Sequence, residues 1–418
     1  MPGAVSQASP PDAEPGPSPH GSAPALTLDP ARQTKARAFA SQRRGLSYLE
    51  TILLALYLVV WILGGLSSLI AVPLRSLGVP WWAGVLVQGI AFFLPRFVIS
   101  LPFRYLGSYA LPRQFGLLTQ SLRSWAVDFA KEVGLLAALG LPSILGLYAL
   151  LRYAADSWWL WAAVGFTLSL LLIAAILPVI LLPIFYRVRP LAAQHAELAE
   201  RLSGLAQRAR ARVRGVFSLE FSRRTPAANA LLLGLGKSRR ILLADTLMAN
   251  FTHDEIETVV AHELAHHIYH DIPVGIGVHA LLSLAAFKIA DIAYRAYAAT
   301  PRLKSLDDPA ALPILMMTLA LSFFLTSPFS RLYSRWRESR ADAFALRLTR
   351  KPQAFASAMR RFANLNLAVA NPSRLASEMA SHPSLVSRIR KAEAFAAELG
   401  AGDDHGGSSP NGHSVERL

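Results

Sequence analysis

The 418-residue sequence contains no cysteine, and only 17% of its residues are charged, whereas 53% are hydrophobic. The lack of cysteine excludes disulfide bonds and thiol catalysis, and it leaves histidine and carboxylates as the strong metal ligands. Acidic residues are also scarce, 27 against 42 lysines and arginines, which gives a net charge of +15. A chain this apolar is unlike a soluble domain and indicates several membrane spans beside a polar domain.

The excess of positive charge has three possible explanations. The protein could bind nucleic acid, it could bind anionic lipid, or the charge could belong to the short cytoplasmic loops of a membrane protein. Lysine and arginine accumulate in cytoplasmic loops of multi-span proteins. We therefore expect the lipid bilayer as a partner and no nucleic acid.

Six apolar segments approach or exceed the ~20 residues that a helix needs to cross the hydrocarbon core. They lie near 47–72, 80–102, 133–152, 157–184, 273–295 and 310–330. Lysine and arginine precede the first segment, which predicts a cytoplasmic N-terminus. Alternation of the spans then places the C-terminus and the polar regions 185–272 and 331–418 in the cytoplasm.

These segments divide the chain into four parts. Proline, serine and glycine without periodicity predict a disordered N-terminal tail over 1–45. Residues 46–186 form a membrane domain of four spans, 187–397 form a mainly polar domain with the last two spans, and 398–418 form a second disordered tail. Within the polar part, Phe217 and Leu219 alternate with polar residues, and "RRILLADTL" is a second apolar run. These two runs predict a small β-sheet.

The stretch "VVAHELAHHIYHD" at 259–271 concentrates histidines in one predicted helix. A capping-box signature at Thr252 and Glu255 starts this helix, which we expect over about 253–270. His262 and His266 lie one turn apart on one face, and Glu263 completes the pattern HExxH. That spacing lets both imidazoles bind one Zn2+ while Glu263 contacts a water molecule. The alternative is a polar helix face without a metal.

A catalytic zinc needs a third protein ligand, and the polar helix "SRWRESRADAFALRL" offers one. Glu338 and Asp342 are one turn apart there. Glu338 can complete the metal site, and Asp342 can accept the free N–H of a ligating histidine. A surface network with the neighbouring arginines is the alternative. Tyr269 and Ile272 stand where the extended metzincin motif requires glycine and histidine, which excludes that class.

Seven motifs in order resemble the type I CAAX prenyl endopeptidases, a family of membrane-embedded zinc metalloproteases. They cover most of 85–395: "LPFRY", "FGLLTQSLRSWAVDFAK", "LPIFYRVRPL", "NALLLGLGKSRRILLADTL", "HELAHH", "SRWRESRADAFA" and "SHPSLVSRI". The resemblance implies a mainly α polytopic membrane fold, with a cytoplasmic gluzincin-like zinc metalloprotease domain that contains a small β-sheet. It also implies one Zn2+ per chain.

The resemblance assigns roles to particular residues. It implies His262, His266 and Glu338 as zinc ligands, Glu263 as the base and Asp342 as the partner of a ligating histidine. His382 and Arg388 of "SHPSLVSR" would stabilise the oxyanion, and Pro383 suits the first turn of a helix with His382 at its N-terminus. Asn229 and Ala230 match the segment whose backbone would pair with an extended substrate; the alternative is an ordinary turn into a strand.

The expected activity is hydrolysis of peptide bonds in peptide or protein substrates at the cytoplasmic side of the membrane, including substrates associated with the membrane. For a bacterial chain the location would be the plasma membrane. Two alternatives remain: a quality-control protease for membrane proteins, similar to the heat-shock metalloproteases, and a catalytically silent membrane scaffold. Cleavage-site mapping separates the first from motif-specific processing, and a lack of bound zinc would favour the second.

Overall fold

The computed structural model describes residues 27–176, 180, 182–191, 193–233, 239–300 and 303–405, and most of them are helical. By length and composition, six helices in this part of the chain can cross a membrane, which confirms the six predicted spans. They are Pro30–Leu63, Trp81–Gln114, Leu122–Tyr153, Trp158–Ile176, Asp271–Ala298 and Pro309–Thr349.

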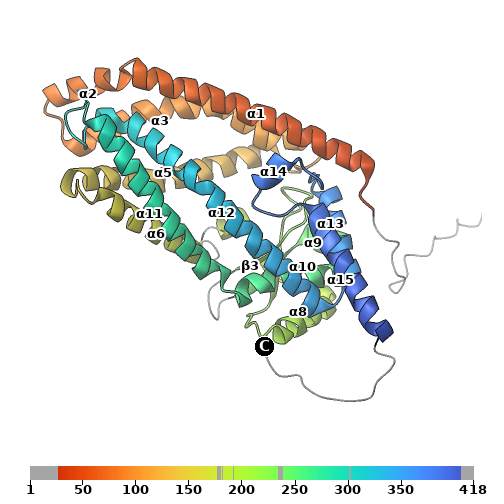
Figure 1. Cartoon of the computed structure of the whole chain (residues 1–418). Helices are drawn as coiled ribbons and strands as arrows, with labels where there is room; N and C mark the ends of the chain where they lie inside the picture. Colours follow the sequence, from red (N-terminus) through yellow and green to blue (C-terminus); the bar gives the residue numbers. More distant parts are fainter. Residues whose placement is uncertain are drawn as a thin grey trace, which may run out of the picture.

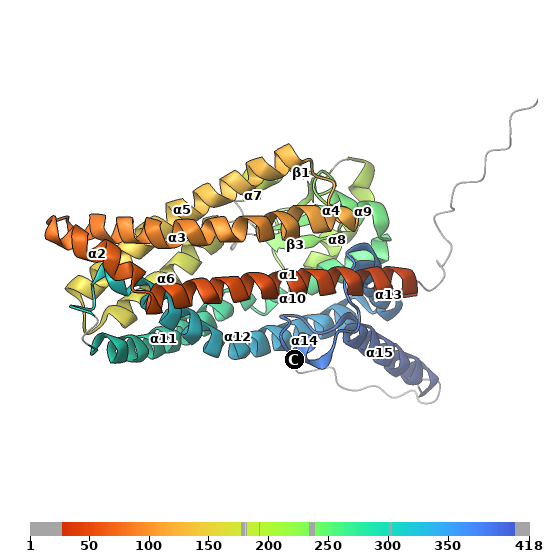
Figure 2. The same ribbon diagram turned by 90° about the horizontal axis from the view of Figure 1, so that it is seen from above.

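The helices that carry these spans follow one another around the molecule (Figures 1 and 2). Each contacts the next in the order α1, α3, α5, α6, α11, α12, and α12 contacts α1, so the six close a ring. The helix bounds are α1 Pro30–Leu63, α2 Leu66–Ser76, α3 Trp81–Tyr105, α4 Leu111–Gln114, α5 Leu122–Tyr153, α6 Trp158–Ile176, α7 Leu182–Phe185, α8 Ala196–Arg208, α9 Asp245–Asn250, α10 His253–Ile268, α11 Asp271–Ala298, α12 Leu312–Thr349, α13 Pro352–Leu365, α14 Arg374–Glu378 and α15 Leu385–His405. A π-helical turn, η1 (Leu106–Ala110), joins α3 to α4.

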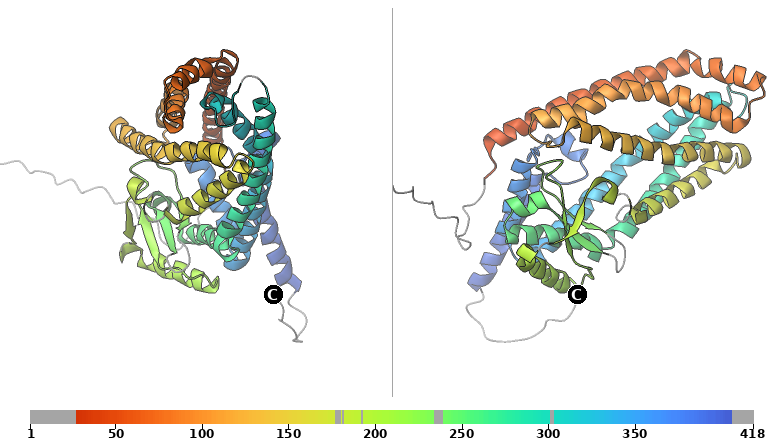
Figure 3. Two further views of the ribbon diagram at one scale, coloured as in Figure 1. Left: turned by 90° about the vertical axis from the view of Figure 1, so that its left-hand side faces the viewer. Right: turned by 180° about the vertical axis from the view of Figure 1, so that it is seen from behind.

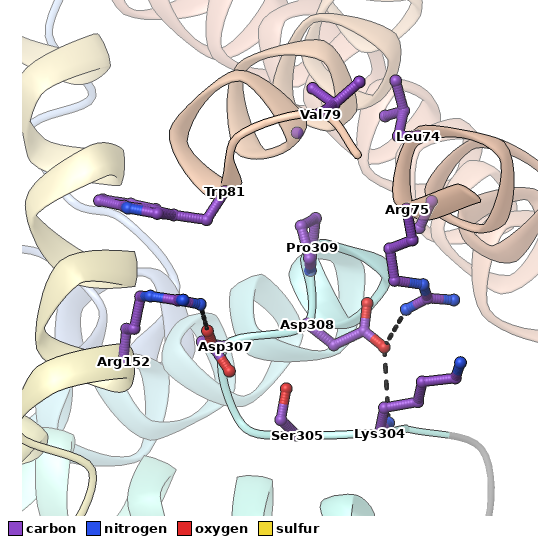
Figure 4. Close-up of a pocket in the computed structure, with 12 residues that line it drawn as sticks. Leu74, Arg75, Val79, Trp81, Arg152, Lys304, Ser305, Asp307, Asp308 and Pro309 are labelled. Carbon is purple, nitrogen blue, oxygen red and sulfur yellow. Dashed lines mark hydrogen bonds and ion pairs between the residues drawn. The ribbon is translucent and has the colours of Figure 1, made fainter. Parts of the chain in front are cut away.

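Buried polar contacts fasten the ring at the end away from the β-sheet. Asp291 of α11 is 2% exposed and accepts hydrogen bonds from Trp158 Nε1 and Arg295 Nε, both at 2.7 Å. A pocket lies at the same end, where the loop before the short turn η5 (Pro309–Ala311) meets α2, α3 and α5. Arg75 and Arg152 reach into this loop and pair with Asp308 and Asp307 (Figure 4). The ion pairs tie three parts of the ring together.

At the other end of the long helices lies a unit built around a four-stranded sheet (Figure 3). Its strands are β1 Val188–Pro190, β2 Val216–Leu219, β3 Ala230–Leu233 and β4 Arg240–Ala244, in the order β1-β2-β4-β3. β2 and β4 are parallel, and the other pairs are antiparallel. The predicted small sheet is confirmed, and β3 lies at its edge.

One apolar core joins this sheet to α8, α10 and α13. Leu202 of α8, Ile256 of α10 and Phe355 of α13 are fully buried in it. Burial of each such side chain stabilises the fold by about 1.5–3 kcal/mol, because its apolar surface is removed from water. The core therefore fixes α10, which carries the histidine motif, against the sheet.

Two helices of the ring continue directly into this unit. α12 has 38 residues, and its second, more polar half packs against α10. α10 is followed at once by α11, and the turn between them is made by His270 in a left-handed conformation, with φ 55°. Glu338 and the histidines are thus held by elements rooted in the membrane part of the fold.

Parts of both predicted disordered tails are helical. Residues 30–45 belong to α1, because its start is docked rather than free: the Gln33 side chain is 9% exposed and bonds the backbone of Ala368 and Ala370. At the other end α15 runs to His405, past the predicted boundary at 398. The remaining parts of both predicted tails, 1–26 and 406–418, lie outside the described residues.

The first apolar segment is also interrupted. It was predicted as one span over 47–72, but α1 ends at Leu63 and a separate helix, α2, begins at Leu66. Gly65 between them has φ +67°, a left-handed conformation that glycine adopts without steric cost. The break turns the chain at the far end of the ring.

Candidate metal centre

Three predicted ligands come together from two helices. His262 and His266 project from α10 and Glu338 from α12, and their ligand atoms all lie within 4.8 Å of one another. His262 Nε2 is 3.3 Å from Glu338 Oε2, and His266 Nε2 is 3.6 Å from Glu338 Oε1. The two imidazole rings stand nearly perpendicular, at 89°. Both Nε2 atoms therefore converge on one carboxylate.

The surroundings of Glu338 fit a cation at this point. The residue is 3% exposed, and its Oε2 atom is bordered only by ring nitrogens of His262 and His382 among the described residues. A buried carboxylate is costly unless cationic or hydrogen-bonding groups compensate its charge, and here neutral imidazoles could do so only in part. Two imidazoles and one carboxylate are a donor set that suits Zn2+ with an open position.

The Nδ1 atoms of both histidines face away from Glu338 and meet aspartates. Asp342 Oδ1 lies 2.9 Å from Nδ1 of His262. Asp271 Oδ2 lies 2.7 Å from Nδ1 of His266, a contact that the sequence did not predict. Carboxylates in these positions fix the ring orientation and leave Nε2 as the metal-binding atom.

Arginines of α12 in turn hold the Asp271 carboxylate in place. Asp271 is 1% exposed, and its carboxylate accepts a hydrogen bond from Arg340 of α12, while Arg337 lies 3.8 Å away. Asp271 reaches the metal site only because the left-handed residue His270 reverses the chain directly after α10. The sequence signal was an acidic residue at the start of a predicted membrane helix.

The pKa values of His262 and Glu263, the first two residues of the motif, are shifted. Burial by itself lowers the pKa of His262, but hydrogen bonds to Asp342 and Glu338 raise this pKa to about 9. Burial raises the pKa of Glu263, against the opposing charges of His262 and His266. Among the described residues, no hydrogen bond or ion pair involves the Glu263 carboxylate, so it is free to take part in proton transfer.

His382 and Arg388 both reach this centre, but on different sides. His382 Nδ1 lies 2.8 Å from Glu338 Oε2, and the His382 side chain is 62% exposed. Arg388 instead donates from Nε and Nη2 to Asp342, at 3.0 Å and 2.6 Å, and its Nη2 is 3.3 Å from His262 Nδ1. Arg388 is therefore directed at the rear of His262, away from the converging Nε2 atoms.

The expected helix start at His382 is displaced. α15 begins at Leu385, and Ser384 caps it by accepting a hydrogen bond from Ser387 N through Oγ at 3.2 Å. Pro383 precedes this cap instead of forming the first helical turn. His382 consequently lies in the preceding bend, outside the end of the helix.

Asn229 and Ala230 lie at the start of the edge strand β3, and their backbones point in opposite directions. The Asn229 carbonyl accepts a hydrogen bond from Ala244 N of β4 at 3.0 Å. Because antiparallel partners alternate along a strand, the N–H and C=O groups of Ala230 and Leu232 point away from β4. The free edge is thus formed by the backbones of Ala230 and Leu232, and the Asn229 backbone is used within the sheet.

Two models of known protein families match this chain. The family model described as "Peptidase family M48" matches residues 192–396, and the model "CAAX prenyl protease N-terminal, five membrane helices" matches residues 22–187. Within the second range the described residues contain four candidate spans and the shorter apolar helix α2. Together the two models match nearly the whole described chain.

Individual relatives cover the same regions. The chain is 28% identical to "Uncharacterized metalloprotease YhfN" of Bacillus subtilis, over 88% of this chain and 87% of that protein. It is 32% identical to "CAAX prenyl protease 1" of Saccharomyces cerevisiae, over 40% of this chain and 37% of that protein. The fold matches the crystal structure of S. mikatae Ste24p with a TM-score of 0.76 at 23% identity, covering 88% of this chain and 90% of that one.

The matched fold, the two family models and the metalloprotease relatives lead to one assignment. The chain is a multi-pass membrane metalloendopeptidase with a peptide or protein substrate, and it belongs to the CAAX prenyl endopeptidase family.

Proposed function

We propose that this metalloprotease is a zinc enzyme that cuts peptide and protein substrates, including membrane-associated ones, at the cytoplasmic surface of the membrane. The observation that carries the proposal is the orientation of the two histidines. Both present Nε2 to Glu338 while a carboxylate holds Nδ1, at 2.9 Å for His262 and 2.7 Å for His266. Rings oriented in this way are prepared for a metal rather than for solvent.

The chain's own groups divide the chemistry among them. His262, His266 and Glu338 would hold one Zn2+, which supplies Lewis acidity that acidifies a water molecule and polarises the scissile carbonyl. Glu263 takes a proton from the attacking water and returns it to the leaving amine. The raised pKa of Glu263 suits this exchange, since it makes the carboxylate a stronger base toward the proton of the water.

We assign different roles to His382 and Arg388. His382 is exposed and lies on the side of Glu338 toward which both Nε2 atoms converge, so it donates to the oxyanion that develops on the substrate. Arg388 is a positioning residue, because its guanidinium is engaged by Asp342 behind His262. Arg388 thus fixes the Asp342 carboxylate, which in turn orients the imidazole ring of His262.

The substrate is bound by strand addition at β3. The outward N–H and C=O groups of Ala230 and Leu232 offer an extended peptide a ladder of main-chain hydrogen bonds. α10 packs against β3, so a peptide on this edge runs along the helix that carries His262 and Glu263. Asn229 contributes by anchoring the start of the strand to β4.

The proteolytic role is tested with purified, detergent-solubilised protein and a diverse peptide pool analysed by mass spectrometry. We expect cleavage by the wild type and at least about a thousandfold loss in Glu263→Gln, with zinc retained, because the base is removed and the ligands remain. Glu200→Gln, an exposed change on α8, is the control. Zinc-free, inactive wild-type protein would refute the proposal.

The orientation of the protein in the membrane is tested with single cysteines, since the chain has no cysteine of its own. Glu200→Cys reports the unit around the sheet, and Ser305→Cys reports the opposite end of the ring; both positions are exposed. In intact cells an impermeant maleimide should label Ser305→Cys and leave Glu200→Cys unlabelled until lysis. The reverse pattern would place the metal centre outside the cytoplasm. In a bacterial host the labelled membrane would be the plasma membrane.

A further inference from the structure

The start of the edge strand is occupied by a side chain from another part of the fold. Asn366, at the C-terminal end of α13, accepts a hydrogen bond from Ala228 N through Oδ1 at 2.9 Å and donates to Ala228 O through Nδ2 at 3.2 Å. One amide side chain thus satisfies both backbone groups of one residue. It makes the pair of bonds that a neighbouring strand would make there.

This contact lies on the edge where the proposed substrate binds. Asn229 bonds β4, so the backbone groups of Ala228, Ala230 and Leu232 share the opposite, outward direction. The first of these three positions is filled by Asn366. A peptide added to β3 can pair with Ala230 and Leu232, but it meets the Asn366 side chain where the next pair would form.

We infer that Asn366 closes one end of the peptide-binding edge of β3, so that the paired substrate segment is short on that side. The enzyme then favours scissile bonds near one terminus of a peptide or at the edge of an accessible segment. The inference rests on the proposed strand addition and adds the residue that limits its length. Asn366 is a specificity-determining residue and takes no part in the chemical step.

The closing side chain is held firmly in place. The backbone N–H of Asn366 bonds Phe362 O at 3.0 Å, and the next residue, Leu367, is 4% exposed in a left-handed conformation with φ 46°. The start of α1 supports the same loop, because Asn364 bonds the backbone of Thr27 and Asp29. A peptide cannot displace Asn366 without disturbing these contacts.

The test is a pair of peptide series built on a sequence that the wild type cleaves. One series is lengthened at the N-terminus and the other at the C-terminus, two residues at a time, because outward backbone groups recur at every second residue. For the wild type we expect kcat/KM to fall about tenfold at one step of one series, as when a transition-state interaction is lost. The other series should show no such step.

Substitution of Asn366 should move that step. In Asn366→Ala the drop is expected two residues later in the same series, because Ala228 becomes free to pair with substrate. Asn366→Asp keeps the acceptor for Ala228 N and a side chain of similar size but loses the donor to Ala228 O, so the drop should stay at the wild-type length and become smaller. The matched control is Gln353→Ala, which removes an exposed amide side chain from the same helix, α13, away from the edge of β3.

The outcomes separate this inference from the proposed function. Wild-type protein that cleaves no peptide defeats the proposed function itself. The closing role of Asn366 is overturned if the wild type cleaves both series without a drop in kcat/KM at any length. It is also overturned if the drop occurs at the same peptide length in Asn366→Ala as in the wild type. If Asn366→Ala does not fold, Asn366→Ser, which keeps a small polar side chain, is measured in the same series with the same criterion.

Discussion

The carboxylate of Asp271 lies 2.7 Å from Nδ1 of His266, although the two residues belong to successive helices separated by a left-handed turn. Asp271 is the first residue of α11, a helix of the ring, so the orientation of a proposed zinc ligand depends on where the ring helix starts. The metal centre and the membrane part of the fold are therefore coupled through one buried carboxylate.

Replacing Asp271 by alanine should weaken zinc binding. Loss of the group that orients a ligating histidine typically lowers metal affinity about 10- to 100-fold. Asp271→Asn keeps an acceptor for the Nδ1 proton and should lose less. Zinc content after dialysis against a graded chelator measures the effect, with Asp307→Asn at the far end of the ring as the control. Equal zinc retention in Asp271→Ala and the control would contradict this dependence.

Arg388 and Asp342 should behave as one unit in kinetics. If Arg388 acts only by holding Asp342, then Arg388→Ala and Asp342→Ala each lower kcat, and the double variant is little worse than the worse single one. A guanidinium in contact with the oxyanion would instead make the two losses multiply. A double-mutant cycle on kcat/KM distinguishes the two, with zinc content measured in every variant.

Much of the ring and the centre could be predicted because the signals are local. Runs of apolar residues identify the spans, and the one-turn spacing of His262 and His266 places them on one helix face. Asp271 could not be assigned in this way, since its approach depends on the conformation of His270. The docked start of α1 was missed for a similar reason: Gln33 is ordered by contacts with Ala368 and Ala370, more than 300 residues later in the chain.

The edge strand shows the same limit. The resemblance pointed to Asn229 and Ala230 together, because both match the family segment that leads into the edge strand. Only the register with β4 shows that the Asn229 backbone faces into the sheet and the Ala230 backbone faces out. Which backbone groups are free is a tertiary property, and no side-chain pattern encodes it.

Asp245 should stabilise the loop before β3 at neutral pH and not in acid. Burial alone raises the pKa of this carboxyl, but hydrogen bonds from Ser222, Phe221 and Thr246 lower it below the usual 3.8. A lowered pKa in the folded state means that the carboxylate stabilises the fold above pH ~4, and that this contribution is lost as the pH falls through the lowered value. The wild type should therefore have a higher Tm than Asp245→Ala at pH 7, and the difference in Tm should become smaller near pH 3. A constant gap would exclude the carboxylate as its source.

Gln33 should matter for catalysis although it lies at the start of the first ring helix. Its amide donates to Ala368 O at 3.2 Å and accepts from Ala370 N at 3.0 Å, and Ala370 O accepts from Val386 N in α15 at 3.2 Å. Gln33→Ala leaves two backbone groups without partners, at a cost of about 1–3 kcal/mol for each that stays buried.

The loop held by Gln33 leads toward both Asn366 and α15, the helix that carries Arg388. Because its loosening displaces groups around the substrate rather than the metal ligands, kcat/KM should fall while zinc content stays unchanged. Gln42→Ala on the same helix, at an exposed position, supplies the comparison. A Gln33→Ala enzyme as active as Gln42→Ala would mean that the membrane helix and the peptide-binding edge are not coupled through this loop.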